Sequence, residues 1–356
     1  MGKANKTIAA LALVIAAAFF TGDAGAAKGP AAYLDRPRSW FAGAAAKRVA
    51  SHILSFQSPL GGWPKNIDTS ADQAKPGGSA LPPTFDNGAT MNELRFLARI
   101  YPATRDESYR DAFDRGLDYI LKAQYPTGGW PQSYPPDGKY HRYITFNDNS
   151  MVNIMNFIRE VATDDRYRFV KTGKRAEARK EFDRGVECIL KCQVKVNGKP
   201  AVWCAQHDEI DFSPRPARAF ERVSLSGSES VGIVRLLMSL DHPDANTATA
   251  VESAVAWFES AKITGHKVVE VADEKSPGGK DRRLVEDPAA APLWARFYDI
   301  GSNRPFFCDR DGIVKYQLSE IGYERRNGYS WLGNWPQTIL GKEYPEWIRT
   351  RADLVR

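Results

Sequence analysis

Two short blocks of sequence recur at nearly constant spacing, and this repeat constrains the fold more than any other feature. An apolar segment that ends in glutamine is followed by a glycine–tryptophan turn at residues 53–64 and 120–131, and more loosely at 189–203. The glutamines Gln57, Gln124 and Gln193 lie 67 and 69 residues apart. Repeated units of this kind bury their apolar faces against neighbouring units, so the chain is expected to stack rather than to form one irregular core.

A second marker follows each block and opens an apolar helix. Residues 84–87 (TFDN), 145–149 (TFNDN) and 226–230 (SGSES) precede apolar segments at 91–100, 151–161 and 231–240. The apolar residues fall on one face of each predicted helix, and Asp, Asn and Ser ahead of them are common N-caps. Three helical hairpins follow, which could form an open solenoid or close into a toroid. Residues 267–272 are the best strand candidate, and 275–281 are expected to form a turn or surface loop.

The N-terminus has the layout of a secretory signal peptide. Lys3 and Lys6 precede an apolar run at 8–20, and small residues follow at 24–26. This run is too short to span a bilayer, and no other stretch reaches 18 apolar residues. We therefore expect a signal peptide at 1–26, an N-terminal segment at 27–39 and one domain at 40–356. The mature protein is expected to be secreted or periplasmic, monomeric and free of membrane partners.

The charge pattern and the cysteine content argue against a nucleic-acid-binding protein and against a disulfide-rich fold. The formal charge is +6, and it becomes +5 once Lys3, Lys6 and Asp23 are removed. Lysine and arginine form no dense block with interleaved aromatics, which argues against nucleic acid as a partner. Four cysteines are too few for a disulfide framework, so either core thiols or a bond from Cys204 to Cys188 or Cys192 fits the sequence.

A repeated acidic dipeptide is the first candidate site. Asp86-Asn87 and Asp148-Asn149 stand at corresponding markers in two repeats. A single such dipeptide would be interpreted as a helix cap. Two of them beside glycine–tryptophan turns raise the alternative of a Ca²⁺ site, since carboxylate and amide oxygens are ligands that Ca²⁺ prefers. The five histidines are scattered and show no zinc spacing.

Arginines and aromatic residues form the second candidate site. A polar segment at 203–230 contains Arg215, Arg218 and Arg222, and a later segment contains Arg296 and Arg310. Arginine binds carboxylates through two parallel hydrogen bonds, although Arg310 could simply pair with a neighbouring aspartate. The tryptophans of the glycine-rich turns are not at helical core spacing and could stack on sugar rings. Together these features indicate an acidic sugar polymer as ligand.

These motifs together resemble the family 10 polysaccharide lyases, which are pectate lyases. The resemblance covers roughly residues 45–345. It rests on an ordered series of blocks: GGWPKN at 61–66, TFDNGAT at 84–90, GGWPQ at 128–132, ITFNDNSMVNIM at 144–155, WCAQHDE at 203–209, ARAFE at 217–221, SLSGSES at 224–230, PLWARFYD at 292–299, RDGIVKY at 310–316 and ERRNGY at 324–329. The pair Arg222-Val223 departs from the family pattern and affects loop shape more than chemistry.

The resemblance implies a fold and an activity. The fold would be an all-α (α/α)₃ toroid with long loops and little β-structure. The activity would be that of a carbon–oxygen lyase, cleaving α-1,4-linked polygalacturonate by Ca²⁺-assisted β-elimination to 4,5-unsaturated oligogalacturonides. Matched by motif, Asp86 and Asp148 would hold the metal, and Asp86, Asn87, Arg218 and Arg296 would bind substrate.

The resemblance also implies that Arg310 is the Brønsted base. The chemistry is coherent, because removing the C5 proton builds negative charge on the adjacent carboxylate, which cations stabilise. Arginine, however, has a pKa above about 12, so physics alone does not predict an arginine base. Lys315 is the runner-up, since burial shifts lysine more readily.

Two alternatives use the same residues. A glycoside hydrolase on the same helical barrel would use Asp86 and Asp148 as its acid and base. A non-catalytic protein that binds acidic polysaccharide would need no base. The chemical nature of the product separates the three.

Overall fold

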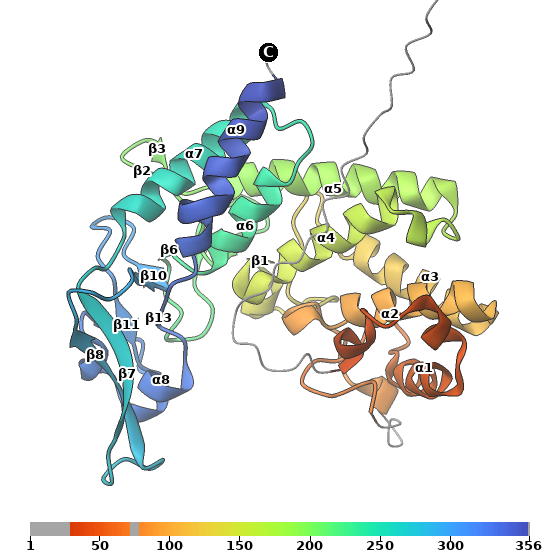
Figure 1. Cartoon of the computed structure of the whole chain (residues 1–356), viewed down its shortest axis with the longest axis horizontal. Coiled ribbons are helices and arrows are strands. Elements are labelled where there is room, and N and C mark those ends of the chain that lie inside the picture. The colour runs from red at the N-terminus through yellow and green to blue at the C-terminus, as the bar shows by residue number, and fades with distance from the viewer. Residues whose placement is uncertain (1–28, 72–77, 355–356) are drawn as a thin grey trace, which may run out of the picture.

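The computed structural model describes residues 29–71 and 78–354 (Figure 1). The predicted signal peptide at 1–26 lies outside these residues. A pair of 3₁₀ turns, Gly29–Tyr33 and Arg38–Ala42, leads into the first helix. Among the described residues, no helix is both long and apolar enough to cross a membrane.

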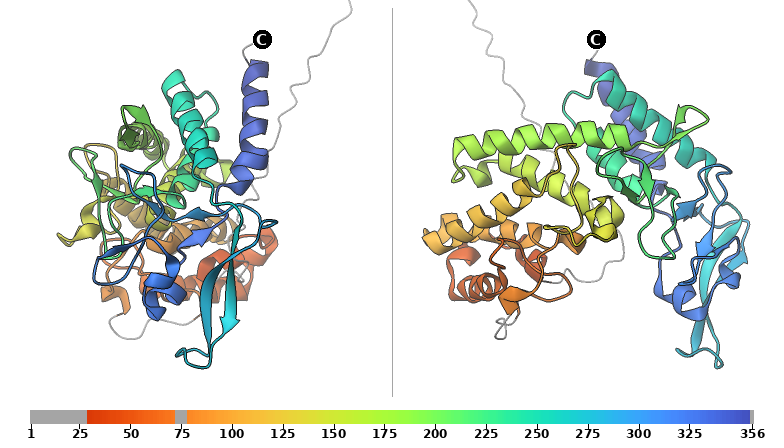
Figure 2. Two further views of the ribbon diagram at one scale, coloured as in Figure 1. Left: turned by 90° about the vertical axis from the view of Figure 1, so that its left-hand side faces the viewer. Right: turned by 180° about the vertical axis from the view of Figure 1, so that it is seen from behind.

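The predicted helical hairpins are present, and they stack as a helix-rich toroid with short strands (Figures 1 and 2). The apolar faces predicted for the second helix of the first two repeats are buried. A further pair of long helices, α7 (Ala245–Ser260) and α9 (Tyr344–Leu354), follows the three repeats, and in Figure 1 α9 lies along α7. In chain order the helices are α1 Ala44–Phe56, α2 Met91–Thr104, α3 Glu107–Lys122, α4 Ser150–Thr163, α5 Thr172–Cys192, α6 Glu229–Met238, α7 Ala245–Ser260, α8 Tyr323–Gly328 and α9 Tyr344–Leu354.

Tryptophans anchor each turn to the helix before it. Trp63, Trp130 and Trp203 are completely buried. Each indole Nε1 donates to a helix carbonyl: that of Ile53 at 2.7 Å, Ile120 at 2.9 Å and Ile189 at 2.7 Å. The expectation that these rings stack on sugar is therefore wrong, because the indole N–H needs a partner inside the protein and finds one in the helix end.

The same anchor occurs a fourth time, at a position that the sequence repeat did not predict. Trp294 is buried, and its Nε1 donates to the carbonyl of Phe258 in α7 at 2.8 Å. The segment around Trp294 therefore occupies the structural position of a fourth repeat. Its sequence lacks the glycine pair that marks the first two.

The glycines of the repeated turns are required by close packing. Gly61 and Gly128 have φ of 106° and 95°, a region that favours glycine. A Cβ at these positions would lie 2.3 Å from the carbonyl oxygen of Arg115 and 2.4 Å from that of Arg184. The turns of the first two repeats thus rest directly on the first helix of the next repeat.

The segment after α7 carries most of the β-structure and a separate small core. The predicted strand at 267–272 is β7 His266–Ala272, which pairs antiparallel with β8 Lys280–Glu286. Of the loop predicted at 275–281, residues 275–279 lie between the two strands, whereas Lys280 and Asp281 begin β8. A second hydrophobic cluster, centred on Phe220, Phe297, Phe307 and Trp331, supports this lobe. The strand β4 Gln206–His207 lies between β1 Ile144–Thr145 and β5 Pro214–Arg215 and pairs with both. The other short strands pair as β2 Lys195–Val196 with β3 Lys199–Pro200, β6 Leu225–Ser226 with β10 Phe297–Tyr298, β9 Trp294–Ala295 with β13 Leu332–Gly333, and β11 Phe307–Cys308 with β12 Val314–Lys315.

All four cysteines are buried free thiols. Of the two alternatives left open by the sequence, the structure therefore shows core thiols.

Candidate active site

Backbone hydrogen bonds place the second marker of each repeat against the tryptophan turns. The first marker residue donates to the tryptophan carbonyl of its own repeat: Thr84 to Trp63 at 3.0 Å, Thr145 to Trp130 at 3.1 Å and Ser226 to Trp203 at 2.8 Å. The next residue donates to a carbonyl two positions after the following tryptophan: Phe85 to Gln132 at 3.0 Å, Phe146 to Ala205 at 2.9 Å and Gly227 to Arg296 at 3.1 Å. Polar side chains from successive repeats are thereby brought to one side of the fold.

These bonds correct the alignment of the two acidic dipeptides. Asp86 corresponds to Asn147, and Asn87 corresponds to Asp148, because Asn87 and Asp148 share a left-handed backbone with φ of 53° and 50°. The two Asp-Asn pairs are therefore one residue out of register. Asp86 points into the protein and is buried, whereas Asp148 is partly exposed.

The capping interpretation of these residues is not supported. The N-cap residues of α2, α4 and α6, which are Thr90, Asn149 and Ser228, make no side-chain cap bond. The Asp86 carboxylate instead accepts hydrogen bonds from Lys65 and, at 2.9 Å, from Nε2 of Gln132. Its other oxygen, Oδ1, is buried without a partner, as is Oε1 of Gln132. Burying a carboxylate oxygen without a hydrogen-bond partner is unfavourable. This oxygen of Asp86 is therefore available as a ligand for a cation.

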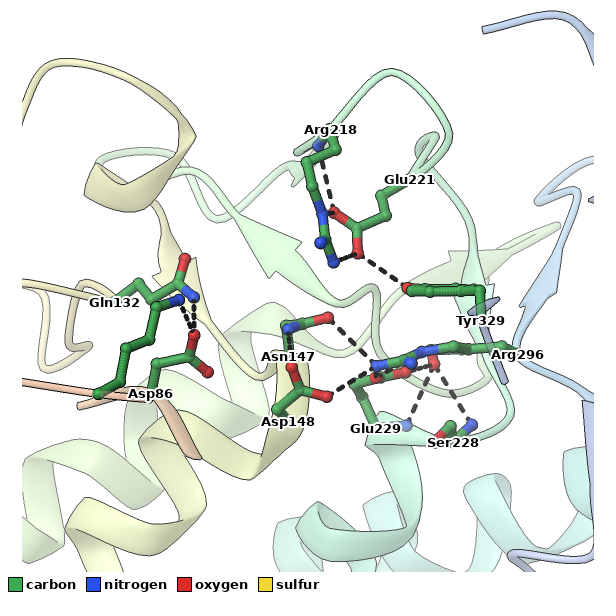
Figure 3. A network of polar contacts seen from close by, with 12 residues as sticks. Asp86, Gln132, Asn147, Asp148, Arg218, Glu221, Ser228, Glu229, Arg296 and Tyr329 are labelled. Carbon is green, nitrogen blue, oxygen red and sulfur yellow. Dashed lines mark hydrogen bonds and ion pairs between the residues drawn. The ribbon is translucent and has the colours of Figure 1, made fainter. Parts of the chain in front are cut away.

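Arg296 connects the second and third repeats (Figure 3). This buried guanidinium donates to Glu229 Oε1 at 2.9 Å, Asp148 Oδ1 at 3.1 Å and Asn147 Oδ1 at 3.3 Å. Burial lowers the pKa of Arg296, but Glu229 and Asp148 outweigh it and the net pKa is raised. Arg296 therefore stays charged beside Asp148.

Arg218 lies above this network and is linked to it through an aromatic ring. Its guanidinium pairs with the buried carboxylate of Glu221, which also accepts the Tyr329 hydroxyl at 2.8 Å. The Tyr329 ring centroid is 5.9 Å from the Arg218 guanidinium carbon and 4.8 Å from that of Arg296. The hydrogen bond from Arg218 to Glu221 raises the pKa of Arg218. Figure 3 shows Asn147 and Asp148 between these arginines and Asp86.

Tyr140 lies near charged residues on both sides of the site. This residue lies in the 3₁₀ turn Tyr140–Arg142. Burial raises the pKa of Tyr140, and the charges of Arg218, Glu221, Lys65 and Asp86 all act on its hydroxyl. The partly buried Tyr140 hydroxyl is therefore influenced both by the Asp86–Lys65 pair and by the Arg218–Glu221 pair.

Arg310 lies at the periphery. Its side chain is 67% exposed and is held by Glu324, with Nη2 3.0 Å from Oε1. This hydrogen bond raises the pKa of Arg310. The guanidinium carbon lies 5.8 Å from the ring centroid of Phe220, which Arg218 and Arg325 approach more closely, at 4.8 and 4.6 Å. The predicted Arg218, Arg296 and Arg310 are thus grouped, with Arg310 on the outer edge.

Sequence reasoning missed several residues of this site. Lys65 and Gln132 stand two positions after a repeated tryptophan, as the predicted Arg296 does, so the repeat itself could have identified them. Glu221 and Glu229 lie within motifs that were noted but received no role. Tyr329 and Arg325 lie in the C-terminal block ERRNGY.

Asn87, which the sequence predicts to contact substrate, is exposed in the structure.

Metal ligands are few in this arrangement. Within residues 29–71 and 78–354, no three histidine, cysteine, aspartate or glutamate side chains form a metal-binding group. Asp86 and Asp148 come from adjacent turns, and the amide oxygens of Gln132 and Asn149 are buried without partners.

Comparison with known proteins gives a consistent result. The family described as pectic acid lyase matches residues 57–340. A family 10 polysaccharide lyase from Cellvibrio cellulosa is 38% identical over 88% of this chain and 94% of that chain, with a TM-score of 0.74. An aspartate-to-alanine mutant of such a lyase from the same organism, in complex with trigalacturonic acid, is 37% identical over 87% of this chain and 95% of that chain, with the same TM-score of 0.74. No curated protein matches this chain.

Proposed function

Because this chain belongs to the pectic acid lyase family and to the family 10 polysaccharide lyases, we propose that it is an exported, Ca²⁺-dependent pectate lyase. It cleaves α-1,4-linked polygalacturonate by β-elimination and leaves 4,5-unsaturated oligogalacturonides. The observation that carries the proposal is the contact of the buried Arg296 guanidinium with Asp148 and Glu229, with Arg218 above it. This places fixed cations next to carboxylates at one site.

The residues present fit a hard cation. Asp86 offers a buried oxygen without a partner, Gln132 offers an amide oxygen, and Asp148 is partly exposed nearby. Two carboxylates and an amide leave positions for water and for carboxylate groups of the substrate, as Ca²⁺ requires. Bound there, Ca²⁺ would act as a Lewis acid on the carboxylate beside C5. Lys65 and Arg296 neutralise Asp86 and Asp148 in the structure described here.

Arg296 and Arg218 are the residues that orient the substrate. Arg296 is rigid, because it is buried and held by Glu229 and Asp148. Arg218 is 43% exposed on its side chain and can reach a ligand. The Arg296 guanidinium, fixed before the reaction, stabilises the charge that develops on the carboxylate when C5 loses its proton.

An arginine base remains part of the proposal, and the geometry supports Arg218 ahead of Arg310. Arg218 shares Tyr329 with Arg296 and so lies next to the carboxylate network, whereas Arg310 faces solvent and Glu324. Both arginines are paired with a carboxylate that keeps them protonated. The base must therefore lose that pairing when substrate binds, and Glu221 is the partner to be displaced from Arg218. Lys315 lies on β12 and stays a candidate only if both arginines fail.

The hydrolase alternative has less support from the geometry. A hydrolase of this kind needs one protonated carboxyl group to act as acid. Asp86 accepts from Lys65 and Asp148 accepts from Arg296, so neither carboxyl group is placed to donate a proton.

Mass spectrometry of short products tests the proposal. β-Elimination splits a purified oligogalacturonate into products that together have the mass of the substrate, with one product unsaturated. Hydrolysis adds one water to the pair. Products that carry the added water would contradict the lyase assignment, and binding without any product would support the non-catalytic alternative.

A further inference from the structure

A groove of about 810 Å³ adjoins Asp86 on the side away from the arginines. It lies between the segments 58–67, 79–84 and 132–141. Lys65, Thr84 and Gln132 line it, and Lys65 and Gln132 also bond the Asp86 carboxylate. The volume lies within the range of about 300–1,000 Å³ that is usual for small-ligand sites. The groove is therefore continuous with the proposed active site and large enough for part of a sugar chain.

The walls of this groove are mainly apolar. Several large side chains in it are exposed without any ligand, at 50% for Leu60, 41% for Ile67 and 36% for Leu81. Tyr134 adds an aromatic ring, and prolines form much of the remaining surface: Pro59, Pro64, Pro82, Pro83 and Pro135. Such a surface suits the apolar C–H face of a sugar and groups that carry no charge.

The charged groups of the groove do not suit a free carboxylate. Among the residues that the structure describes, no arginine lines it. Lys65 is engaged by Asp86, and His141 Nδ1 lies 2.8 Å from Asp137 Oδ2. Among the described residues, a galacturonate carboxylate placed there would meet Asp137 and apolar walls without a free cation, and burying an unpaired charge is unfavourable. The opposite side of the site contains Arg218, Arg296, Arg310 and Arg325.

We propose that this groove binds a methyl-esterified galacturonate residue of the polymer, on one side of the bond that is cut. The inference rests on the proposed lyase function and adds a specificity to it. The ester removes the charge that the groove cannot pair, and its methyl group gains apolar contact with residues such as Leu81 and Ile67. The enzyme would then recognise a free galacturonate at the arginines and tolerate or prefer an ester at the groove.

A charge placed in the groove tests this specificity. Leu81→Arg adds a cation for a free carboxylate, and Ile348→Arg is the matched control, because Ile348 is 38% exposed and lies on α9. The measured quantity is the ratio of kcat/KM on partly methyl-esterified pectin to kcat/KM on fully de-esterified polygalacturonate. We expect Leu81→Arg to lower this ratio by about tenfold, or about 1.4 kcal/mol. Ile348→Arg should leave the ratio unchanged.

The products give a second measurement. Esters in wild-type products should occur at a fixed distance from the new end on one side of the cut, and Leu81→Arg should remove that preference. A ratio equal in all three proteins, or esters spread evenly around the cut, would overturn the proposal.

Failure of the lyase function can be told apart from failure of the groove. If wild type cleaves neither polymer, calorimetry with trigalacturonate and with its methyl ester decides the matter. If Leu81→Arg binds the methyl ester more weakly than wild type does, while its binding of trigalacturonate is not weakened, the groove proposal is supported. If wild type and variant bind the methyl ester equally well, the proposal is overturned.

Discussion

The carboxylate half of the site and the arginine half are built in different ways. Asp86, Asp148 and Glu229 lie where repeated turns enter α2, α4 and α6, and the same backbone hydrogen bonds hold all three turns. Arg218, Arg310 and Arg325 lie on loops and on α8, next to a small second core around Phe220. The repeat therefore fixes backbone positions for acidic groups, while a less regular lobe supplies most of the cations.

One position shows how the two halves meet. Two residues after each anchoring tryptophan stand Lys65, Gln132, Ala205 and Arg296, one in each structural repeat. The backbone slot is the same, but its side chain is a cation, an amide, a methyl group and a second cation. A repeated fold thus provides the geometry, and the individual residue at each slot provides the chemistry.

The largest effect should come from the arginine half. We expect Arg218→Lys to lower kcat by roughly 10²–10⁴-fold, the range that a general base contributes, with a smaller change in KM. Arg310→Lys should stay within about tenfold of wild type, since Arg310 is exposed. Steady-state kinetics on polygalacturonate measures both. Loss of turnover in Arg310→Lys with an active Arg218→Lys would return the base to Arg310.

The next largest effect tests the carboxylate half. Asp86→Ala and Asp148→Ala should each lower the apparent Ca²⁺ affinity by at least roughly 10–100-fold. That is the loss usually seen when a residue that only supports a metal ligand is removed. Calcium titration of the rate measures this, and circular dichroism checks folding. Asp165→Ala is the control, because Asp165 forms only an exposed ion pair with Arg168. Unchanged calcium dependence in both site variants would remove the metal from this half.

A pH-dependent effect on stability should come from the interior of the first repeat. Glu93 is buried near the start of α2 and accepts the Thr69 hydroxyl at 2.7 Å, and burial raises its pKa to about 7. The folded state therefore holds a proton that the unfolded state releases above its ordinary pKa of 4.5. Stability from this group is present below pH 4.5 and is lost as pH rises through about 7.

We expect Glu93→Gln to remove this loss, which amounts to about 3 kcal/mol between pH 5 and pH 8. Chemical denaturation at the two pH values measures it in wild type and variant. A pH dependence that is identical in the two proteins would show that Glu93 ionises freely.

The smallest effect tests whether the fourth tryptophan belongs to the repeat. Trp130→Phe and Trp294→Phe each remove one indole hydrogen bond to a helix carbonyl and should each cost about 1–3 kcal/mol. Trp347→Phe is the control, since this tryptophan lies on the peripheral helix α9. Equal costs at Trp130 and Trp294 would support four equivalent anchors. A negligible cost at Trp294 alone would restrict the repeat to three.

The sequence predicted the repeated half of the molecule well. Constant spacing of Gln57 and Gln124, and the apolar faces of the following helices, were enough to identify the hairpins. It also predicted the β7 strand, because alternation over 267–272 is a local signal. The register of Asp86 against Asp148 was one residue wrong, because the two Asp-Asn pairs were matched to each other, whereas the Thr-Phe ahead of each pair places Asp86 opposite Asn147.

The arginine half could not be predicted from the residues alone. Contacts of Arg296 with Asp148 and Glu229 join residues 148 and 67 positions apart, and no local pattern specifies such pairs. The exposure of Arg310 depends on how the loop packs around Phe220. Burial of the turn tryptophans was missed because loop position suggested solvent, whereas the indole N–H required an internal acceptor.

The most direct measurement of the central claim is ultraviolet absorbance during incubation with polygalacturonate and Ca²⁺. A lyase produces an unsaturated, absorbing end with each cut. The account predicts that absorbance and new reducing ends rise together, that a chelator stops both, and that excess Ca²⁺ restores them. New reducing ends without absorbance would contradict β-elimination, and a rate unaffected by the chelator would contradict the role of calcium.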